Sequence, residues 1–125
     1  MSERLRAIVD DLDIQASDRV LEIGCGHGLA AGMVCERLRS GCLVAIDKSK
    51  KMIDAAVRRN HAHVASGRAQ FHVTDVVDYK PGRRKFNKIF AVRVGLFHRD
   101  PSLARSLLEP WLAPGGKIVL VYDEP

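Results

Sequence analysis

A chain of 125 residues is long enough for one hydrophobic core and too short for two domains of ordinary size. Apolar residues make up 46% and charged residues 28%, as in an ordinary globular protein, and no apolar run approaches the roughly 20 residues that cross a bilayer. The first residues also lack the apolar segment of a secretory signal, so we expect a single domain over residues 1–125, located in the cytoplasm and not in a membrane.

The cysteines and the charges limit the kinds of site. Cys25, Cys35 and Cys42 are odd in number and unevenly spaced, without a CxxC pair or a histidine at metal-ligand spacing, so we expect neither a disulfide framework nor a metal site. The net charge of +5 comes from basic clusters in the second part of the chain, which lack interleaved aromatic residues. This pattern favours a solvated basic face, and we do not expect nucleic acid as a partner.

The first third of the chain predicts a helix, a strand and a second helix. Apolar residues recur at helical spacing over Glu3–Leu12. A short strand is expected at Arg19–Ile23, and it ends in a glycine-rich turn. Helical spacing resumes over Leu29–Leu38, and we expect Gly41 to end this second helix.

The middle of the chain predicts a second strand, a long helix and a third strand. Cys42–Ile46 is an apolar run without polar alternation, typical of a strand buried on both faces, and it stops at Asp47. Ser49 is expected to cap a helix that runs to about Val64, and Ala69–Val73 forms the third strand. The helix side chains expected to face the core are Met52, Ile53, Ala56 and Val57.

The last third predicts two more strands around one helix. The fourth strand is expected at Lys88–Val94 and the fifth at Lys117–Tyr122. Between them, Asp100 opens a helix over Leu103–Leu112, whose last turn Pro110 must distort. Strands and helices alternate along the chain, which predicts an α/β fold with a parallel sheet and crossover helices.

The residues that point to a ligand all follow predicted strands. Gly24, Gly26 and Gly28 follow the first strand, where the backbone can turn sharply and offer amide donors at a helix N-terminus. Asp47 ends the second strand, where a carboxylate can accept from both hydroxyls of a ribose, and Asp75 follows the third, where it can meet an adenine amino group. In an open parallel sheet, ligands bind beyond these carboxyl ends. The coincidence predicts a ligand that contains a nucleoside.

Two other nucleotide-binding patterns fit this turn poorly. A dinucleotide fingerprint reads G-x-G-x-x-G, whereas Leu29 occupies the position of its third glycine here. A phosphate-binding P-loop needs G-x-x-x-x-G-K-[ST], which is absent from the sequence.

The segment Val20–Gly28 resembles the first motif of class I S-adenosylmethionine-dependent methyltransferases, which reads roughly (V/L)-L-(E/D)-(I/L)-G-x-G-x-G. The family also carries an acidic residue after the second strand, here Asp47, and an Asp after the third, here Asp75. Its Leu-x-Pro-Gly-Gly turn before the fifth strand is present as Leu112–Gly116. The resemblance covers nearly the whole chain and implies a three-layer Rossmann-like parallel sheet of about five strands in the order 3-2-1-4-5.

The resemblance implies that the chain binds S-adenosyl-L-methionine, with S-adenosyl-L-homocysteine as the product. The glycine-rich turn would surround the methionine part, whose ammonium would donate to the backbone after the fourth strand. The residues that follow the second and third strands would meet the ribose and the adenine. The implied donor-binding residues are Glu22, Gly24, Cys25, Gly26, Asp47, Lys48, Met52, Thr74, Asp75, Val76, Val92 and Arg93.

Methyl transfer from a sulfonium is a direct displacement, so the protein must chiefly align donor and acceptor and exclude water. A general base is needed only for a protonated acceptor, and the catalytic candidates are Arg93 and His98. Arg93 could bind a carboxylate or phosphate of the acceptor. No (D/N/S)-P-P-(Y/F) segment follows the fourth strand, which argues against the amino-methylating enzymes of DNA. Asn87 replaces the usual Asp of the family far from the pocket, and we expect little consequence.

The leading interpretation is a methyltransferase that acts on a small molecule. The alternative is a reduced, non-catalytic module that binds S-adenosylmethionine and serves as a sensor or partner subunit. The chain resembles a short family member that ends after the fifth strand, without the usual C-terminal antiparallel strand pair. Lys117–Tyr122 would then be an exposed apolar edge strand, and we expect this edge, or the uncovered sheet face, to form a homodimer.

Overall fold

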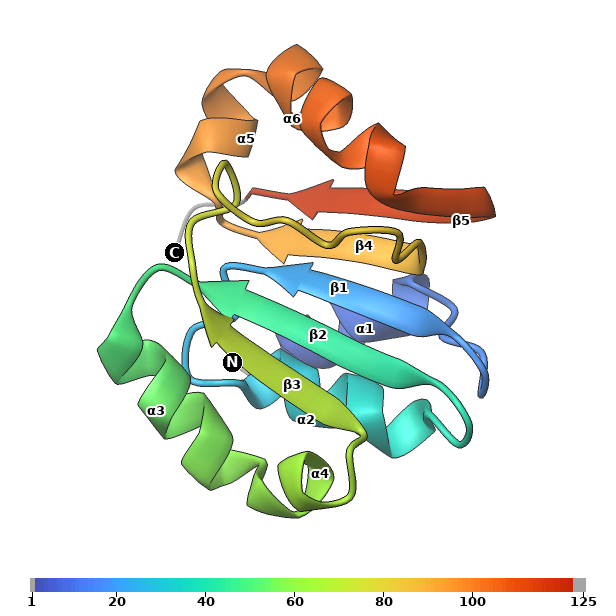
Figure 1. Ribbon diagram of the computed structural model, residues 1–125, viewed down its shortest axis with the longest axis vertical. Helices are drawn as coiled ribbons and strands as arrows, with labels where there is room; N and C mark the ends of the chain where they lie inside the picture. Colours follow the sequence, from blue (N-terminus) through green and yellow to red (C-terminus); the bar gives the residue numbers. More distant parts are fainter. Residues whose placement is uncertain (1, 123–125) are drawn as a thin grey trace.

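The computed structural model describes residues 2–122, which form a parallel sheet with helices on both faces (Figure 1). Its strand order is β3-β2-β1-β4-β5, which confirms the three-layer Rossmann-like prediction. The strands are β1 (Arg19–Ile23), β2 (Cys42–Asp47), β3 (Ala69–Val73), β4 (Phe86–Val92) and β5 (Leu112–Val121). The helices are α1 (Ser2–Asp11), α2 (Leu29–Arg37), α3 (Lys50–Arg59), α4 (His61–Ala65), α5 (Gly95–Arg99) and α6 (Pro101–Leu108), followed by a 3-10 turn, η1 (Glu109–Trp111).

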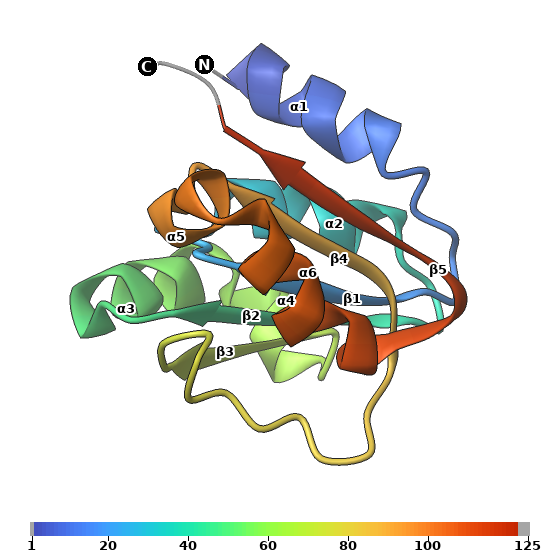
Figure 2. The ribbon, with the colours of Figure 1, turned by 90° about the horizontal axis from the view of Figure 1, so that it is seen from above.

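Each face of the sheet has its own apolar core, because side chains alternate between the faces along a strand. Figure 2 shows α1 and α2 on one side of the sheet and α5 and α6 on the other. Val20 and Phe90 are fully buried in the first core, beneath α1, α2 and α3. Leu21 and Ile89 are fully buried in the second, beneath α5 and α6. The central strand β1 is therefore buried on both sides and holds its carboxyl end in a fixed position.

The long helix predicted after Ser49 is two helices. The Ser49 side chain caps α3 as predicted, accepting from the backbone N–H of Met52 at 3.2 Å. However, Asn60 leaves the helical conformation, with φ −110° and ψ 28°, so α3 ends before it and α4 begins after it. Ile53 and Ala56 face the core as predicted, whereas Met52 is 37% exposed and does not.

Gly41 does not end α2. The helix stops four residues earlier, where Leu38 has an extended backbone with φ −87° and ψ 148°. Gly41 is needed for a close approach instead, since a Cβ atom there would lie 2.1 Å from the backbone oxygen of Asp18.

The bounds of the last two strands also differ from the prediction. β4 begins at Phe86, which is fully buried and pairs with Leu112. It ends at Val92, two residues before the predicted end. The predicted tight turn lies within β5 as an irregularity in its register, with Gly115 at a φ of 76°. Asp100 caps the following helix as predicted, accepting from the N–H of Leu103 at 3.0 Å. The predicted distortion at the end of that helix is the 3-10 turn η1.

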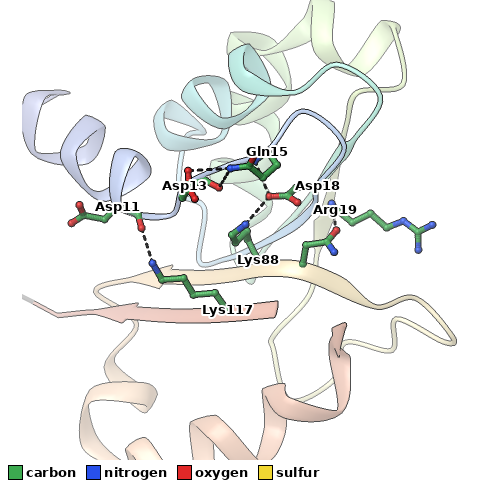
Figure 3. Close-up of polar contacts among 8 residues, drawn as sticks. Asp11, Asp13, Gln15, Asp18, Arg19, Lys88 and Lys117 are labelled. Carbon is green, nitrogen blue, oxygen red and sulfur yellow. Dashed lines mark hydrogen bonds and ion pairs between the residues drawn. The ribbon is translucent and has the colours of Figure 1, made fainter. Parts of the chain in front are cut away.

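The amino edge of the sheet is held by polar contacts that lie away from the carboxyl ends (Figure 3). Lys88 Nζ lies 2.8 Å from Asp18 Oδ2, and both side chains are largely buried, with exposures of 14% and 10%. The same Asp18 oxygen accepts from the backbone N–H of Gln15. Asn87 Oδ1 accepts from the N–H of Arg19 at 2.7 Å. One member of the predicted basic face is thus part of a structural ion pair.

Candidate functional site

A cavity of about 510 Å³ opens beyond the carboxyl ends of the strands, the end at which the arrowheads lie in Figure 1. Its walls come from the ends of β1, β2 and β4, the segment after β3, and α5. The predicted site residues that line it are Gly24, Asp47, Lys48, Thr74, Asp75, Val76, Val92 and Arg93. The fold therefore brings together in one cavity residues that are far apart in the sequence.

The glycine-rich loop after β1 needs glycine for two separate reasons. Gly24, Gly26 and Gly28 have φ values of 72°, 55° and 87°, in the left-handed region that other residues rarely adopt. At Gly24 a Cβ atom would also lie 2.8 Å from Cγ2 of Val94. The loop consequently turns sharply under the end of β4 and presents backbone to the cavity.

Asp47 connects this loop to the end of β2. Its Oδ2 accepts from the backbone N–H of Gly26 at 2.9 Å, and its Oδ1 accepts from that of Ser49 at 2.9 Å. The backbone oxygen of Asp47 accepts from Thr74 N–H at 3.0 Å, which adds the end of β3 to the same network. Each carboxylate oxygen keeps a second lone pair, so Asp47 can still accept from two ligand hydroxyls.

The segment after β3 forms the side of the cavity away from β4. Asp75 is exposed, and its Oδ1 accepts from the N–H of Val77 at 3.4 Å. Val76 is buried in the second core and anchors the segment. An exposed carboxylate beside an anchored backbone can bind the edge of a ligand ring that carries hydrogen-bond donors.

Glu22 and Cys25 lie behind the cavity wall, and neither lines it. Glu22 is 4% exposed, and within residues 2–122 its Oε1 has no hydrogen-bond partner. Burial, and then the charge of Asp47, raises the pKa of Glu22 to about 8. Burial, and then the charges of Glu22 and Asp47, raises the pKa of the Cys25 thiol above its ordinary value. A protonated Cys25 thiol is no nucleophile at neutral pH.

Arg93 follows β4 with a strained backbone. Its φ of 59° lies in the left-handed region, which costs a non-glycine residue about 1–3 kcal/mol. Its N–H donates to the backbone oxygen of Val121 at 2.7 Å, which holds the chain against the end of β5. Val92 and Arg93 both line the cavity.

Not all of the predicted site residues reach the cavity. His98 lines a neighbouring hollow of about 330 Å³, where its ring stacks on that of Tyr122 at 3.9 Å between centroids and 14° between planes. Gly26 and Met52 also lie outside the cavity lining. Arg99 lines the cavity and was missed, because the helix that carries it, α5, has too few residues for its apolar spacing to be recognised.

Asn60 supports the glycine-rich loop from behind. Its side chain is 4% exposed, and Nδ2 donates to the backbone oxygens of Gly28 at 2.9 Å and Ala56 at 3.0 Å. A Cβ atom on Gly28 would lie 2.6 Å from this Nδ2, and one on Gly32 would lie 2.8 Å from Oδ1. The two glycines therefore form a slot for the Asn60 amide, for which the sequence gives no local signal.

Two further kinds of feature are absent from residues 2–122. No helix in this part of the chain is long and apolar enough to cross a membrane. Within the same residues, no group of three or more His, Cys, Asp or Glu side chains could hold a metal ion.

Comparison with known proteins agrees with this geometry. The family described as "Methyltransferase domain" matches residues 20–116. The chain is 32% identical over 116 residues to "Putative methyltransferase YrhH" of Bacillus subtilis (strain 168), and this match covers 93% of the chain and 63% of the relative. It is also 32% identical over 119 residues to Phosphoethanolamine N-methyltransferase 1 of Triticum aestivum, covering 94% and 23%. The chain thus spans only part of each of these relatives.

A solved structure shares the fold closely. The S-adenosylmethionine-dependent methyltransferase from Thiobacillus denitrificans, in complex with S-adenosyl-L-homocysteine, superposes with a TM-score of 0.80 at 25% sequence identity. The superposition covers 96% of this chain and 48% of that one.

Proposed function

The chain belongs to the class I S-adenosylmethionine-dependent methyltransferase family, and we propose that it binds S-adenosylmethionine and transfers the methyl group to a small-molecule acceptor. The observation that carries the proposal is the meeting of Gly24, Asp47 and Asp75 in one cavity at the carboxyl edge of the sheet. The chain covers only part of the length of its relatives. The methyltransferase activity of the whole protein is therefore proposed together with donor binding. We treat residues 1–125 as one donor-binding domain.

The residues present fit this donor. S-adenosylmethionine supplies an electrophilic methyl group on a sulfonium sulfur and leaves as S-adenosylhomocysteine. The loop at Gly24–Gly28 has the left-handed glycine backbone that lets a ligand approach closely. Glu22 is buried beneath this loop, and its Oε1 has no hydrogen-bond partner among residues 2–122, so it is an acceptor that suits the methionine ammonium or sulfonium.

Each wall of the cavity has a role in the proposal. Asp47 accepts from the ribose hydroxyls, for which it has free lone pairs, while it continues to hold Gly26. Asp75 and the backbone at Val76 meet the edge of the adenine. The backbone at Val92–Arg93 accepts from the methionine ammonium. The remaining donor-binding positions in the proposal are Gly24, Lys48 and Thr74, which line the cavity, together with Cys25 and Met52, which lie outside its lining in the free protein.

The acceptor side of the cavity is the part near β4 and α5. The main task of the protein is to align the acceptor with the donor and to exclude water, and a base is needed only for a protonated acceptor. Arg93 lines this side of the cavity, whereas His98 stacks on Tyr122 outside it. We therefore assign acceptor contacts to Arg93 and leave His98 without a role in the reaction.

Two experiments test the proposal in order. Calorimetric titration compares S-adenosylmethionine, S-adenosylhomocysteine and NAD, and we expect the first two to bind in the micromolar range and NAD not to bind. Methyl-labelled donor is then incubated with small acceptors. Phosphoethanolamine is included because it appears in the name of one relative. Failure of both adenosyl compounds to bind contradicts the proposal. Binding without transfer to any acceptor supports the non-catalytic module instead.

The proposal includes two properties inferred first from the sequence. Within residues 2–122, β5 pairs only with β4 and forms an edge of the sheet, and we propose that this edge pairs with a second copy. Sedimentation that shows only monomer at tens of micromolar contradicts the dimer. Location in the cytoplasm stays a prediction.

A further inference from the structure

The charges in the cavity are distributed unevenly. Asp47 and Asp75 supply carboxylates from the side of β2 and β3, and Lys48 lies next to Asp47 in the sequence. Arg93 and Arg99 supply guanidinium groups from the end of β4 and from α5. The described lining residues therefore carry three positive and two negative charges, a net charge of +1 before a ligand binds.

Arg99 lines this cavity, one helical turn after Gly95. Its guanidinium lies over Gly95, so that Nη1 would be 2.9 Å from a Cβ atom on that residue. Across residues 2–122, no hydrogen bond or ion pair holds this guanidinium. The side chain is also exposed. Its charge and its five N–H donors are thus available to a ligand in the cavity.

The bound donor increases the positive charge of the cavity. S-adenosylmethionine has a carboxylate, an ammonium and a sulfonium, which together add one net positive charge. Before the donor binds, Glu22 adds no charge to this count, because burial raises its pKa to about 8 and keeps it mostly protonated at neutral pH. A cavity with excess positive charge attracts an anion and repels a cation.

Building on the function proposed above, we propose that the methyl acceptor carries an anionic group, a carboxylate or a phosphate, and that Arg99 binds this group. The planar guanidinium matches two oxygens of either anion with parallel hydrogen bonds. Its position in α5 places the anion on the acceptor side of the cavity, opposite the two aspartates that serve the adenosine. Arg99 is thus a specificity-determining residue, which favours a charged acceptor over its neutral or cationic counterpart.

Titration with inorganic phosphate tests this assignment without knowledge of the acceptor. Backbone amide chemical shifts are followed at neutral pH and constant ionic strength, for the free protein and for its complex with S-adenosylhomocysteine. We expect saturable shifts around Gly95 at millimolar phosphate. Arg99→Gln should weaken phosphate binding about fivefold, as expected for one exposed charged contact. The matched control is Arg58→Gln, an exposed arginine in the last turn of α3, outside the cavity, which should change nothing.

The possible results separate this assignment from its alternatives. Equal weakening by Arg99→Gln and Arg58→Gln shows an adventitious ion only and overturns the assignment. Absence of saturation up to about 50 mM phosphate also overturns it. If Arg99→Gln weakens S-adenosylhomocysteine binding instead, the guanidinium serves the donor carboxylate. If S-adenosylhomocysteine does not bind the wild type, the proposed function fails, while the phosphate titration of the free protein still tests Arg99.

Discussion

Gly28 and Gly32 form a slot around the Asn60 side chain. This slot predicts that Gly32→Ala destabilises the protein when Asn60 is present and stabilises it when Asn60 is replaced by alanine. Gly32 is the fourth residue of α2, where alanine is the better helix former by about 1 kcal/mol. In the wild type, however, a Cβ atom at position 32 would lie 2.8 Å from Asn60 Oδ1. Gly32→Ala should therefore push the amide out of its slot.

The size of the effect follows from the hydrogen bonds of Asn60. Its Nδ2 donates to the backbone oxygens of Gly28 and Ala56, and each net hydrogen bond contributes about 0.5–1.5 kcal/mol. Both oxygens keep a backbone donor, since Gly32 N–H reaches Gly28 and Asn60 N–H reaches Ala56. Asn60→Ala should then cost about 1–3 kcal/mol. Gly32→Ala loses much of the same energy and gains helix propensity, for a net cost of up to about 2 kcal/mol.

Urea unfolding of the two single variants and the double variant measures the coupling. In the Asn60→Ala background the clash is absent, and Gly32→Ala should stabilise the protein by about 1 kcal/mol. The control is His61→Ala, at an exposed neighbouring position, with an expected change within about 0.5 kcal/mol. An effect of Gly32→Ala with the same sign and size in both backgrounds would refute the slot.

Three further outcomes can be checked on the same protein. Asp47→Asn should weaken calorimetric binding of S-adenosylhomocysteine by about 1–3 kcal/mol, while Asp78→Asn, an exposed carboxylate outside the cavity lining, should not. Because the pKa of Glu22 is raised to about 8, the folded protein holds a proton that the unfolded chain releases. The free energy of unfolding should therefore fall as pH rises from about 5 to about 8, and Glu22→Gln should remove that fall; an unchanged slope contradicts the assignment. Burial raises the pKa of the Cys25 thiol, so its alkylation at mildly alkaline pH should be slower than that of free cysteine, and equal rates contradict this.

The buried part of the fold was predictable because burial leaves a local pattern. β1 and β3 have the predicted bounds, and β2 differs by one residue. β2 is an apolar run that ends at Asp47, β1 is a mostly buried segment that ends at a glycine, and β3 alternates apolar with polar residues before Thr74. The cavity residues Gly24, Asp47 and Asp75 were found for the same reason, because the carboxyl end of a buried strand can be recognised in the sequence. The order of the strands came from the family resemblance.

What could not be predicted depends on contacts between distant segments. The break between α3 and α4 falls at Asn60, which contacts Gly28, 32 residues earlier in the chain. α5 has only five residues, too few for an apolar period to be distinguished from a loop. Closeness in sequence to Arg93 predicts His98 at the site, but the turn of α5 directs its ring toward Tyr122. Such placements are set by tertiary packing, which spacing along the chain does not encode.

Hydrogen exchange with and without S-adenosylhomocysteine tests the central assignment most directly, because it locates the ligand on the backbone. We expect slower exchange in three segments that line or form the cavity, residues 24–28, 47–48 and 74–76. Residues 61–63, in the hollow between α2 and α4, should not change. Protection confined to residues 61–63, or no protection at saturating ligand, would contradict the donor site at the carboxyl edge of the sheet.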